Sequence, residues 1–167
     1  LFRVTSGLSG NLSSNRYWSG TVFVNGDITV SNNISLTIYP ATLIKFVAGK
    51  TLNINGYLSA VGNTNSHINC TRSGSSGSWG GIMFYDSASD ASQVSYCDIS
   101  YASYGVYANR CSPTIQHCTI SNCSYGIVSY YGAPQIHENV LANNVYYGIG
   151  LKYADNAGQG TEIVDSN

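Results

Sequence analysis

Short alternations of apolar and polar residues run along most of the chain. Segments 21–24, 43–46, 51–54 and 57–61 alternate in this way and are separated by Gly, Asn, Ser and Pro. A period of two residues is typical of β-strands, and no window shows the i, i+3, i+4 apolar spacing with caps that an amphipathic helix requires. The pattern predicts an all-β protein built from short strands.

A longer repeat overlies the strand pattern between residues 94 and 151. Apolar, cysteine or asparagine, and tyrosine–glycine positions recur in it at one constant offset. They are Val94/Ile115/Ile136, Ile99/Ile120/Leu141, Cys97/Cys118/Asn139 and Tyr104-Gly105/Tyr125-Gly126, with Tyr147-Gly148 one residue late. A period of about 21 residues is the signature of a repeat architecture in which each unit packs on the next.

The repeat favours a solenoid over a β-sandwich, because a sandwich has no reason to keep a constant offset through three copies. In a solenoid the coils stack about 4.8 Å apart, so equivalent residues form columns. Apolar columns would fill the interior, and the Cys97/Cys118/Asn139 column would occupy an inward corner, where Asn can satisfy turn backbone groups. The Gly105/Gly126/Gly148 column would mark a turn with tight or left-handed geometry.

We therefore expect one β-solenoid domain over residues 1–167, with parallel strands and coils of about 21 residues. The coils would span 16–151. Residues 1–15 and 152–167 break the repeat and would serve as caps or as assembly arms.

The motif Ile-x-x-Asn/Cys-x-Ile-Ser-Asn-x-x-Tyr-Gly-Ile resembles the repeat of right-handed parallel β-helix proteins with the pectin-lyase-like fold. Segments 20–30, 36–46 and 78–84 are similar to the entry region of secreted archaeal and bacterial cell-surface β-helix proteins. The resemblance covers about residues 15 to 151 and implies a right-handed single-stranded parallel β-helix. It implies no single activity, because this fold hosts lyases, hydrolases, epimerases, adhesins and structural proteins.

Composition limits the partners and the location. Charged residues make up 9% of the chain and the formal net charge is −1, so the basic footprint of a nucleic-acid-binding protein is absent. No apolar run reaches the roughly 20 residues of a membrane span. The Ser/Asn/Thr/Gly-rich polar surface predicts an extracellular or cell-envelope location. No signal peptide is visible and the chain begins at Leu1, which fits a mature form or a fragment.

The five cysteines lack zinc-finger spacing. Cys97 and Cys118 are in phase on adjacent coils, where Cα atoms about 4.8 Å apart fall within the range that a disulfide accepts. We predict this disulfide, with Cys111 and Cys123 as a second candidate pair and Cys70 left for an intermolecular bond or for burial. The alternative is that all five are buried as small apolar residues.

Four Asn-X-Ser/Thr sequons, at Asn11, Asn33, Asn69 and Asn122, are glycosylation candidates if the chain crosses a glycosylating secretory route. In a chain this rich in Asn and Ser, several sequons are also expected by chance.

The resemblance implies that enzymes of this fold gather acids, basic residues and sometimes calcium on one outer face. The Tyr96/His117/Glu138 column is the best catalytic candidate, although a surface hydrogen-bond column is the interpretation we prefer. Asp86 and Asp90 lie in a loop that is a calcium candidate with only two acids. No cofactor and no other metal site is expected.

Tyrosines form the other candidate surface, since 11 of the 14 lie from Tyr85 onward. The candidates for a protein interface or for stacking on sugar rings are Tyr104, Tyr125, Tyr130, Tyr131, Tyr146 and Tyr147. A tyrosine ladder that supports coil stacking is the alternative.

Two hypotheses of function follow. The first is a non-enzymatic structural protein of the cell envelope, such as a sheath, surface-layer, adhesin or filament subunit that self-assembles as a homo-oligomer or polymer. The second is a β-helix protein that binds or degrades polysaccharide. Of the two, we favour the non-enzymatic hypothesis.

Overall fold

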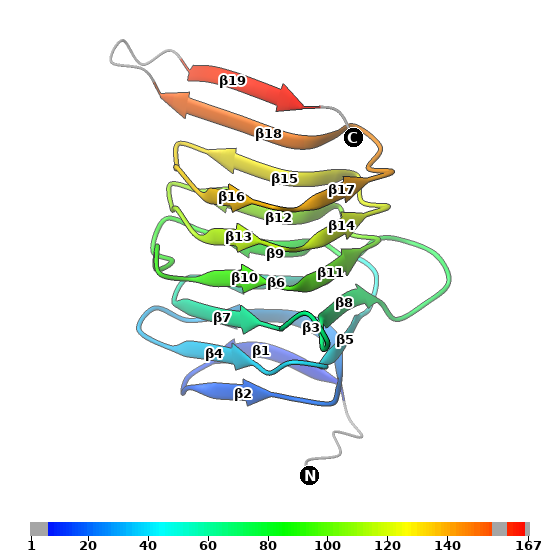
Figure 1. The fold of residues 1–167 in the computed structure, drawn as a ribbon. Helices are drawn as coiled ribbons and strands as arrows, with labels where there is room; N and C mark the ends of the chain where they lie inside the picture. Colours follow the sequence, from blue (N-terminus) through cyan, green and yellow to red (C-terminus); the bar gives the residue numbers. More distant parts are fainter. Residues whose placement is uncertain (1–6, 155–159, 166–167) are drawn as a thin grey trace.

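The fold was analysed in a computed structural model that describes residues 7–154 and 160–165, with only the backbone described from residue 153 onward. Parts of the predicted caps or arms, at 1–6, 155–159 and 166–167, lie outside the described residues. The described residues form strands and no helix, so no helix among them is long and apolar enough to cross a membrane. The strands stack in coils in chain order (Figure 1).

Each coil contributes one strand to each of three faces. The first face is a six-stranded sheet of β2 (Arg16–Trp18), β4 (Ser35–Ile38), β7 (Tyr57–Val61), β10 (Gln93–Ser95), β13 (Thr114–Gln116) and β16 (Gln135–His137). The second face contains the first part of β3 (Thr21–Val30), then β5 (Leu43–Phe46), β8 (Ile68–Arg72), β11 (Cys97–Ser100), β14 (Thr119–Ser121) and β17 (Val140–Ala142).

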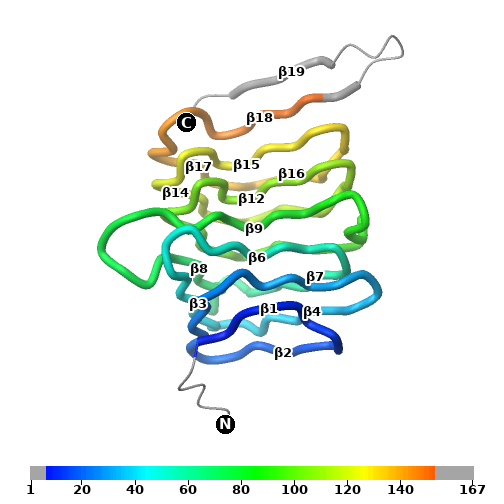
Figure 2. Tube along the Cα trace, turned by 180° about the vertical axis from the view of Figure 1, so that it is seen from behind, coloured from blue at the N-terminus to red at the C-terminus, as the bar shows by residue number. Residues whose placement is uncertain are grey.

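The third face contains β1 (Leu8–Leu12), the second part of β3, β6 (Thr51–Ile54), β9 (Gly81–Phe84), β12 (Tyr104–Asn109), β15 (Tyr125–Tyr130), β18 (Tyr147–Ala154) and β19 (Gly160–Asp165). Figure 2, turned by 180° from the view of Figure 1, shows this face toward the viewer. β3 bends across two faces, since its start pairs with β5 and its end pairs with β6. All pairings between these strands are parallel except that of β18 with β19.

Equivalent residues stack in columns, as the repeat predicts. One column runs along the first face through Trp18, Ile38, Ala60, Val94, Ile115 and Ile136. Another runs along the second face through Val22, Ile44, Cys70, Ile99, Ile120 and Leu141. Apart from the last member of each, these side chains are buried. The predicted all-β parallel solenoid, with the coil length that the repeat indicates, is confirmed.

The chain turns between faces at residues in the left-handed backbone region. Tyr96, His117 and Glu138 have φ angles of 50° to 52° at one corner, and Tyr101 and the residues in phase with it repeat this at the next. From Tyr96 onward, these two corners therefore have one strained position in each coil, and its side chain lies in a column on the outer surface.

The glycine column serves a different purpose from the predicted turn. Gly105 and Gly126 lie within β12 and β15 and are not among the residues with positive φ. A Cβ on Gly126 would lie 2.2 Å from the carbonyl oxygen of Gly148, and one on Gly105 would lie 2.6 Å from that of Gly126. Glycine recurs because adjacent coils approach too closely for a side chain.

Candidate functional site

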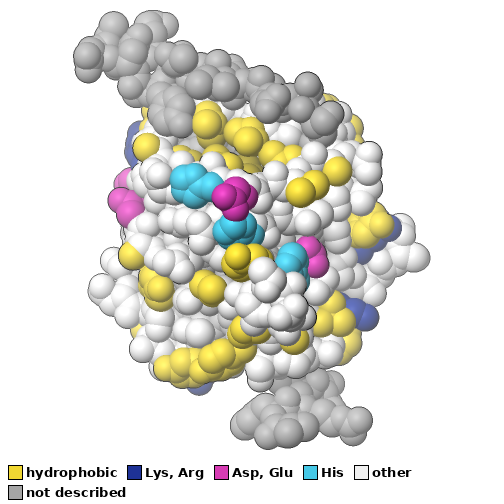
Figure 3. All heavy atoms as spheres, viewed as in Figure 1, with side chains coloured by type: hydrophobic (Ala, Val, Ile, Leu, Met, Phe, Trp, Pro, Cys, Tyr) yellow, Lys and Arg dark blue, Asp and Glu magenta, His cyan; other side chains and the backbone are white. Residues whose placement is uncertain are grey.

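The predicted Tyr96/His117/Glu138 column lies at the corner between the first and second faces. His117 Nδ1 is 2.9 Å from Glu138 Oε2. The His117 ring stacks on Tyr96, with 4.6 Å between ring centroids and 15° between planes. Figure 3 shows histidine and acidic side chains gathered on this side of the molecule. The structure thus brings the three predicted residues together.

The same cluster includes His67 and Asp98, which the sequence did not indicate. His67 Nδ1 lies 3.0 Å from Asp98 Oδ1, and the His67 ring meets Tyr96 edge-on at 5.8 Å between centroids. His67 precedes the repeat and follows a different offset from Tyr96. Only the pairing of Ile68 with Cys97 places it one coil below.

In both ion pairs the carboxylate can only accept, so His Nδ1–H donates and Nε2 remains without a protein partner among the described residues. The two histidine side chains are 30% and 33% exposed. Histidines that act as general bases or metal ligands are often oriented in this way, with Nδ1–H bonded to a carboxylate and Nε2 available. However, the described residues hold no group of three or more His, Cys, Asp or Glu side chains that could bind a metal ion.

The cluster also connects coils. Asp98 on β11 pairs with Thr119 on β14, which in turn pairs with Val140 on β17. No acid therefore lies directly above Asp98 in the next two coils. Its partner His67 comes from the coil below, while Glu138 reaches down to His117. Each ion pair therefore joins two adjacent coils, and Tyr96 connects the two pairs.

The predicted tyrosines form a stacked ladder on the outside of the third face. Tyr104 and Tyr125 stack with centroids 4.9 Å apart, and Tyr125 and Tyr146 stack at 4.7 Å. Tyr147 pairs with Tyr125 in strand register, but its ring is tilted by 57° against it. The rings cover one another's faces, so the two faces of the Tyr125 ring are taken up by Tyr104 and Tyr146 and are not open to a sugar ring.

The other tyrosine candidates are placed differently. Tyr130 lies 5.9 Å from Tyr107 and 6.5 Å from Tyr131, both in tilted arrangements. The Arg110 guanidinium lies 5.8 Å from the centroid of the exposed Tyr131 ring. Burial and neighbouring tyrosines raise the pKa of Tyr107 above its ordinary value.

The cysteine and asparagine column faces inward, as predicted. Asn139 Oδ1 accepts the Cys118 N–H at 2.9 Å, and its Nδ2 donates to the Ile115 carbonyl at 2.9 Å. In the equivalent place one coil below, Cys118 Sγ lies 3.4 Å from the Val94 carbonyl. A second column at the next corner repeats this design, with Asn144 Oδ1 accepting the Cys123 N–H.

All five cysteines are buried, and none of them forms a disulfide in this structure. Burial raises the pKa of Cys70 to about 12. A hydrogen bond between the Cys97 and Cys118 thiols raises the pKa of Cys97 and lowers that of Cys118. The Cys97–Cys118 disulfide thus stays a prediction.

The second candidate pair is separated by the length of a strand. Cys111 lies against Gly132 after the end of β12, whereas Cys123 lies beside Ala102 before its start. β12 alone spans about 20 Å at the usual rise of a strand. Cys111 and Cys123 therefore cannot pair within one chain, because a disulfide needs Cα atoms within about 7 Å.

The remaining candidates lie on the surface. The four sequon asparagines, Asn11, Asn33, Asn69 and Asn122, are all exposed. In the calcium-candidate loop, Asp86 is exposed, and Asp90 Oδ1 accepts the Ser112 N–H at 2.6 Å. Asp90, one of the two acids of this loop, thus bonds the backbone of the next coil.

Comparison with known proteins gives one match. The family model for a right-handed β-helix region matches residues 5–167. No curated protein and no solved structure matched the chain. The match agrees with the stacked parallel coils, the inward columns and the three faces described above. The chain belongs to the right-handed β-helix family.

Proposed function

We propose that this chain is a non-enzymatic structural protein of an extracellular or cell-envelope surface, and that it joins a second copy of itself end to end. The main observation that supports this is the incomplete burial of apolar side chains in the terminal rungs, a rung being the set of strand residues at one level of a column. Of the five partly buried apolar side chains that pack against the core, four belong to the first or last coil: Leu8, Leu12, Ile136 and Leu141. A second copy stacked on the carboxyl end would continue the columns of the first and second faces and bury Ile136 and Leu141.

The strand edges at the carboxyl end support the same proposal. Gln135 N–H and the His137 carbonyl bond to the coil below, so by strand alternation both backbone polar groups of Ile136 face away from it. The bonds of Val140 N–H and the Ala142 carbonyl give Leu141 the same orientation. Among the described residues, no strand pairs with the outer edges of β16 and β17. An open parallel edge is a template for pairing with another chain.

The opposite end offers a complementary surface. β2 is the outer strand of the first face, and its Trp18 heads the same column that Ile136 ends. Stacking β2 of one copy on β16 of another at the ordinary strand spacing would require β1 of the former and β19 of the latter to leave the third face, because these strands occupy its two ends. Because this contact is heterologous, it repeats and generates a filament rather than a closed dimer.

The test is sedimentation velocity across a concentration series, with negative-stain electron microscopy of the same samples. The wild type should form rods whose length increases with concentration. Leu141→Lys places a charge on the terminal rung and should abolish this growth, whereas Thr119→Lys adds the same charge to the side of the coil below and should not.

Ile136→Pro provides an independent variant, because it removes an N–H that the internal ladder does not use. Circular dichroism confirms that each variant is folded. A wild type that stays monomeric at every concentration, or growth that survives both end variants, would overturn the proposal.

A role in acting on polysaccharide is the alternative, and the two histidine–carboxylate pairs with outward Nε2 atoms favour it. A screen for polysaccharide depolymerisation tests it. Activity lost in His117→Gln and retained in Thr119→Ser would support the alternative over the structural proposal.

A further inference from the structure

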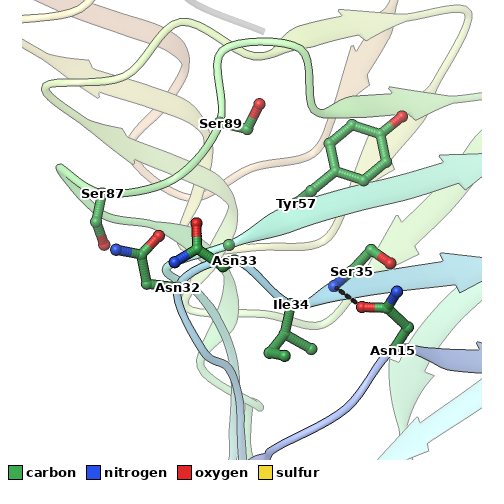
Figure 4. Close-up of a pocket in the computed structure, with 9 residues that line it drawn as sticks. Asn15, Asn32, Asn33, Ile34, Ser35, Tyr57, Ser87 and Ser89 are labelled. Atoms are coloured by element: carbon green, nitrogen blue, oxygen red, sulfur yellow. Dashed lines mark hydrogen bonds between the residues drawn. The ribbon is translucent and has the colours of Figure 1, made fainter.

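A polar cavity lies at the corner where the chain passes from the third face to the first, away from the histidine cluster. Its volume is about 240 Å³. It is formed by the segments before β2 and β4, the Gly56–Tyr57 junction, and the loop between β9 and β10. Figure 4 shows the side chains that line it, which come from these separate segments.

Two of the lining residues, Ile34 and Tyr57, carry apolar or aromatic surface, and one glycine allows the coils to meet beside them. Ile34 and the Tyr57 ring are both half-buried there. Ile34 N–H donates to the Ser31 carbonyl at 3.0 Å and closes a tight turn. A Cβ on Gly56 would lie 2.2 Å and 2.3 Å from the carbonyl oxygens of Ile34 and Ser31, so only glycine lets the next coil pass this close above the turn.

The walls carry amides and hydroxyls and no charged side chain. Asn15 is held in place, since its Oδ1 accepts the Ser35 N–H at 2.9 Å. Asn32 and Asn33 occupy the turn, where the positive φ of Asn33 (62°) presents the two amides together. The side chains of Asn32 and Asn33 and the Tyr57 hydroxyl have no hydrogen-bond partner in the described part of the chain.

These features together indicate the class of ligand. An amide donates and accepts at once, which matches adjacent hydroxyl groups that do the same. An aromatic ring beside them offers an apolar surface for the C–H face of a sugar ring. The volume is below the roughly 300–1,000 Å³ of sites for drug-sized ligands, and the lack of lining charge disfavours ionic ligands. We propose that this cavity binds one residue of a neutral carbohydrate.

The site lies on the side of the coils, and its only lining residue in the terminal coil is Asn15, which precedes the outer strand β2. It is also separate from the histidine cluster, which lies at the next corner. Ser87 and Ser89 of the β9–β10 loop complete the rim with hydroxyls, so binding would connect this loop to the turn before β4.

The test is a nuclear magnetic resonance titration of the full chain, produced without N-glycosylation because Asn33 is itself a sequon residue. The probes are the methyl glycosides of glucose, galactose and mannose, with glucuronate as a charged comparison. We expect saturable shifts of the Asn32 and Asn33 side-chain amides with at least one neutral glycoside, and weaker binding of glucuronate.

Asn32→Ala should weaken binding about fivefold through the loss of one or two hydrogen bonds. Tyr57→Ala should weaken it more than Tyr57→Phe, because the ring face matters as well as the hydroxyl. Asn65→Ala, at an exposed turn outside the cavity, is the matched control and should bind like the wild type. Absence of saturable shifts with all three glycosides, or binding that Asn32→Ala leaves unchanged, would overturn the proposal.

Discussion

The two halves of the solenoid have the same architecture and different sequences. From Val94 onward the rungs of the first face recur at a constant offset, as Val94, Ile115 and Ile136. Before Val94 the same column runs through Ile38 and Ala60 at unequal spacings, because loops of different length separate the strands. Stacking thus requires an apolar residue at each rung and does not require a constant coil length.

The halves also satisfy their inward corners with different chemistry. In the carboxyl half, Asn139 and Asn144 bond the backbone of the coil below. In the amino half, the fully buried Thr42 hydroxyl lies 2.6 Å from the Tyr39 carbonyl and 3.4 Å from the Trp18 carbonyl. The backbone groups at a corner need a partner, and either an amide or a hydroxyl can supply it.

Matched truncations of one column should show whether the two halves are equally stable. Ile115→Ala and Ile38→Ala each empty a rung that is at most 1% exposed. Each should lower the free energy of unfolding by about 2–5 kcal/mol, and Ile136→Ala on the terminal rung should cost less. Urea unfolding measures all three. A much smaller loss at Ile38 would mean that the irregular half is loosely packed.

The inward corners should respond next most strongly. Asn144→Ala leaves the Cys123 N–H and the Ile120 carbonyl without the amide, and should cost about 1–3 kcal/mol. Thr42→Val tests the hydroxyl of the amino half in the same thermal or urea unfolding experiment. Cys118→Asn places an amide one coil below Asn139, and it should lower the free energy of unfolding only slightly or raise it. If Asn144→Ala is neutral, the amide column contributes nothing to stability.

The buried thiols predict a loss of stability at high pH. Because burial raises the pKa of Cys70 from 9.0 to about 12, its contribution is complete below pH 9 and is lost as pH rises toward 12. The unfolded thiol ionises first, which destabilises the folded state by about 1 kcal/mol at pH 10.

Unfolding of reduced protein at pH 7 and pH 10 measures this effect. Cys70→Ala should lose less stability over that range than the wild type. Cys123→Ala tests the carboxyl half, where burial raises the pKa of the thiol to about 11. An identical loss in wild type and both variants would assign the effect to tyrosines instead.

The smallest effect is expected at the exposed ion pairs. Glu138 is 72% exposed, so Glu138→Gln should change stability by less than about 1 kcal/mol, and by less still in high salt. Asp98→Asn removes a carboxylate that is less exposed than that of Glu138 and whose pair with His67 joins the two halves. Thermal unfolding at two salt concentrations compares them. If Glu138→Gln lowers stability by much more than about 1 kcal/mol, the cluster is a strong connection between coils.

The candidate site could be predicted only where the repeat extends. Tyr96, His117 and Glu138 are in phase at the period of the repeat, so their column follows from counting. His67 and Asp98 join them through a coil of different length, which no period reveals. The cavity over Gly56 was also missed, because it combines four segments whose stacking order depends on strand pairing.

Alternation of period two and the regular repeat from Val94 onward determined, from sequence alone, that the chain is a parallel β-solenoid and which residues fill its later rungs. The tertiary structure decided what those patterns leave open. It showed that the glycine column serves close approach between coils, that Cys111 and Cys123 lie at opposite ends of a strand, and that uncharged side chains from four segments form one cavity. The physical reason is that periodicity fixes the phase of a residue within its coil, whereas contacts between irregular coils depend on loop lengths that only the folded chain brings into register.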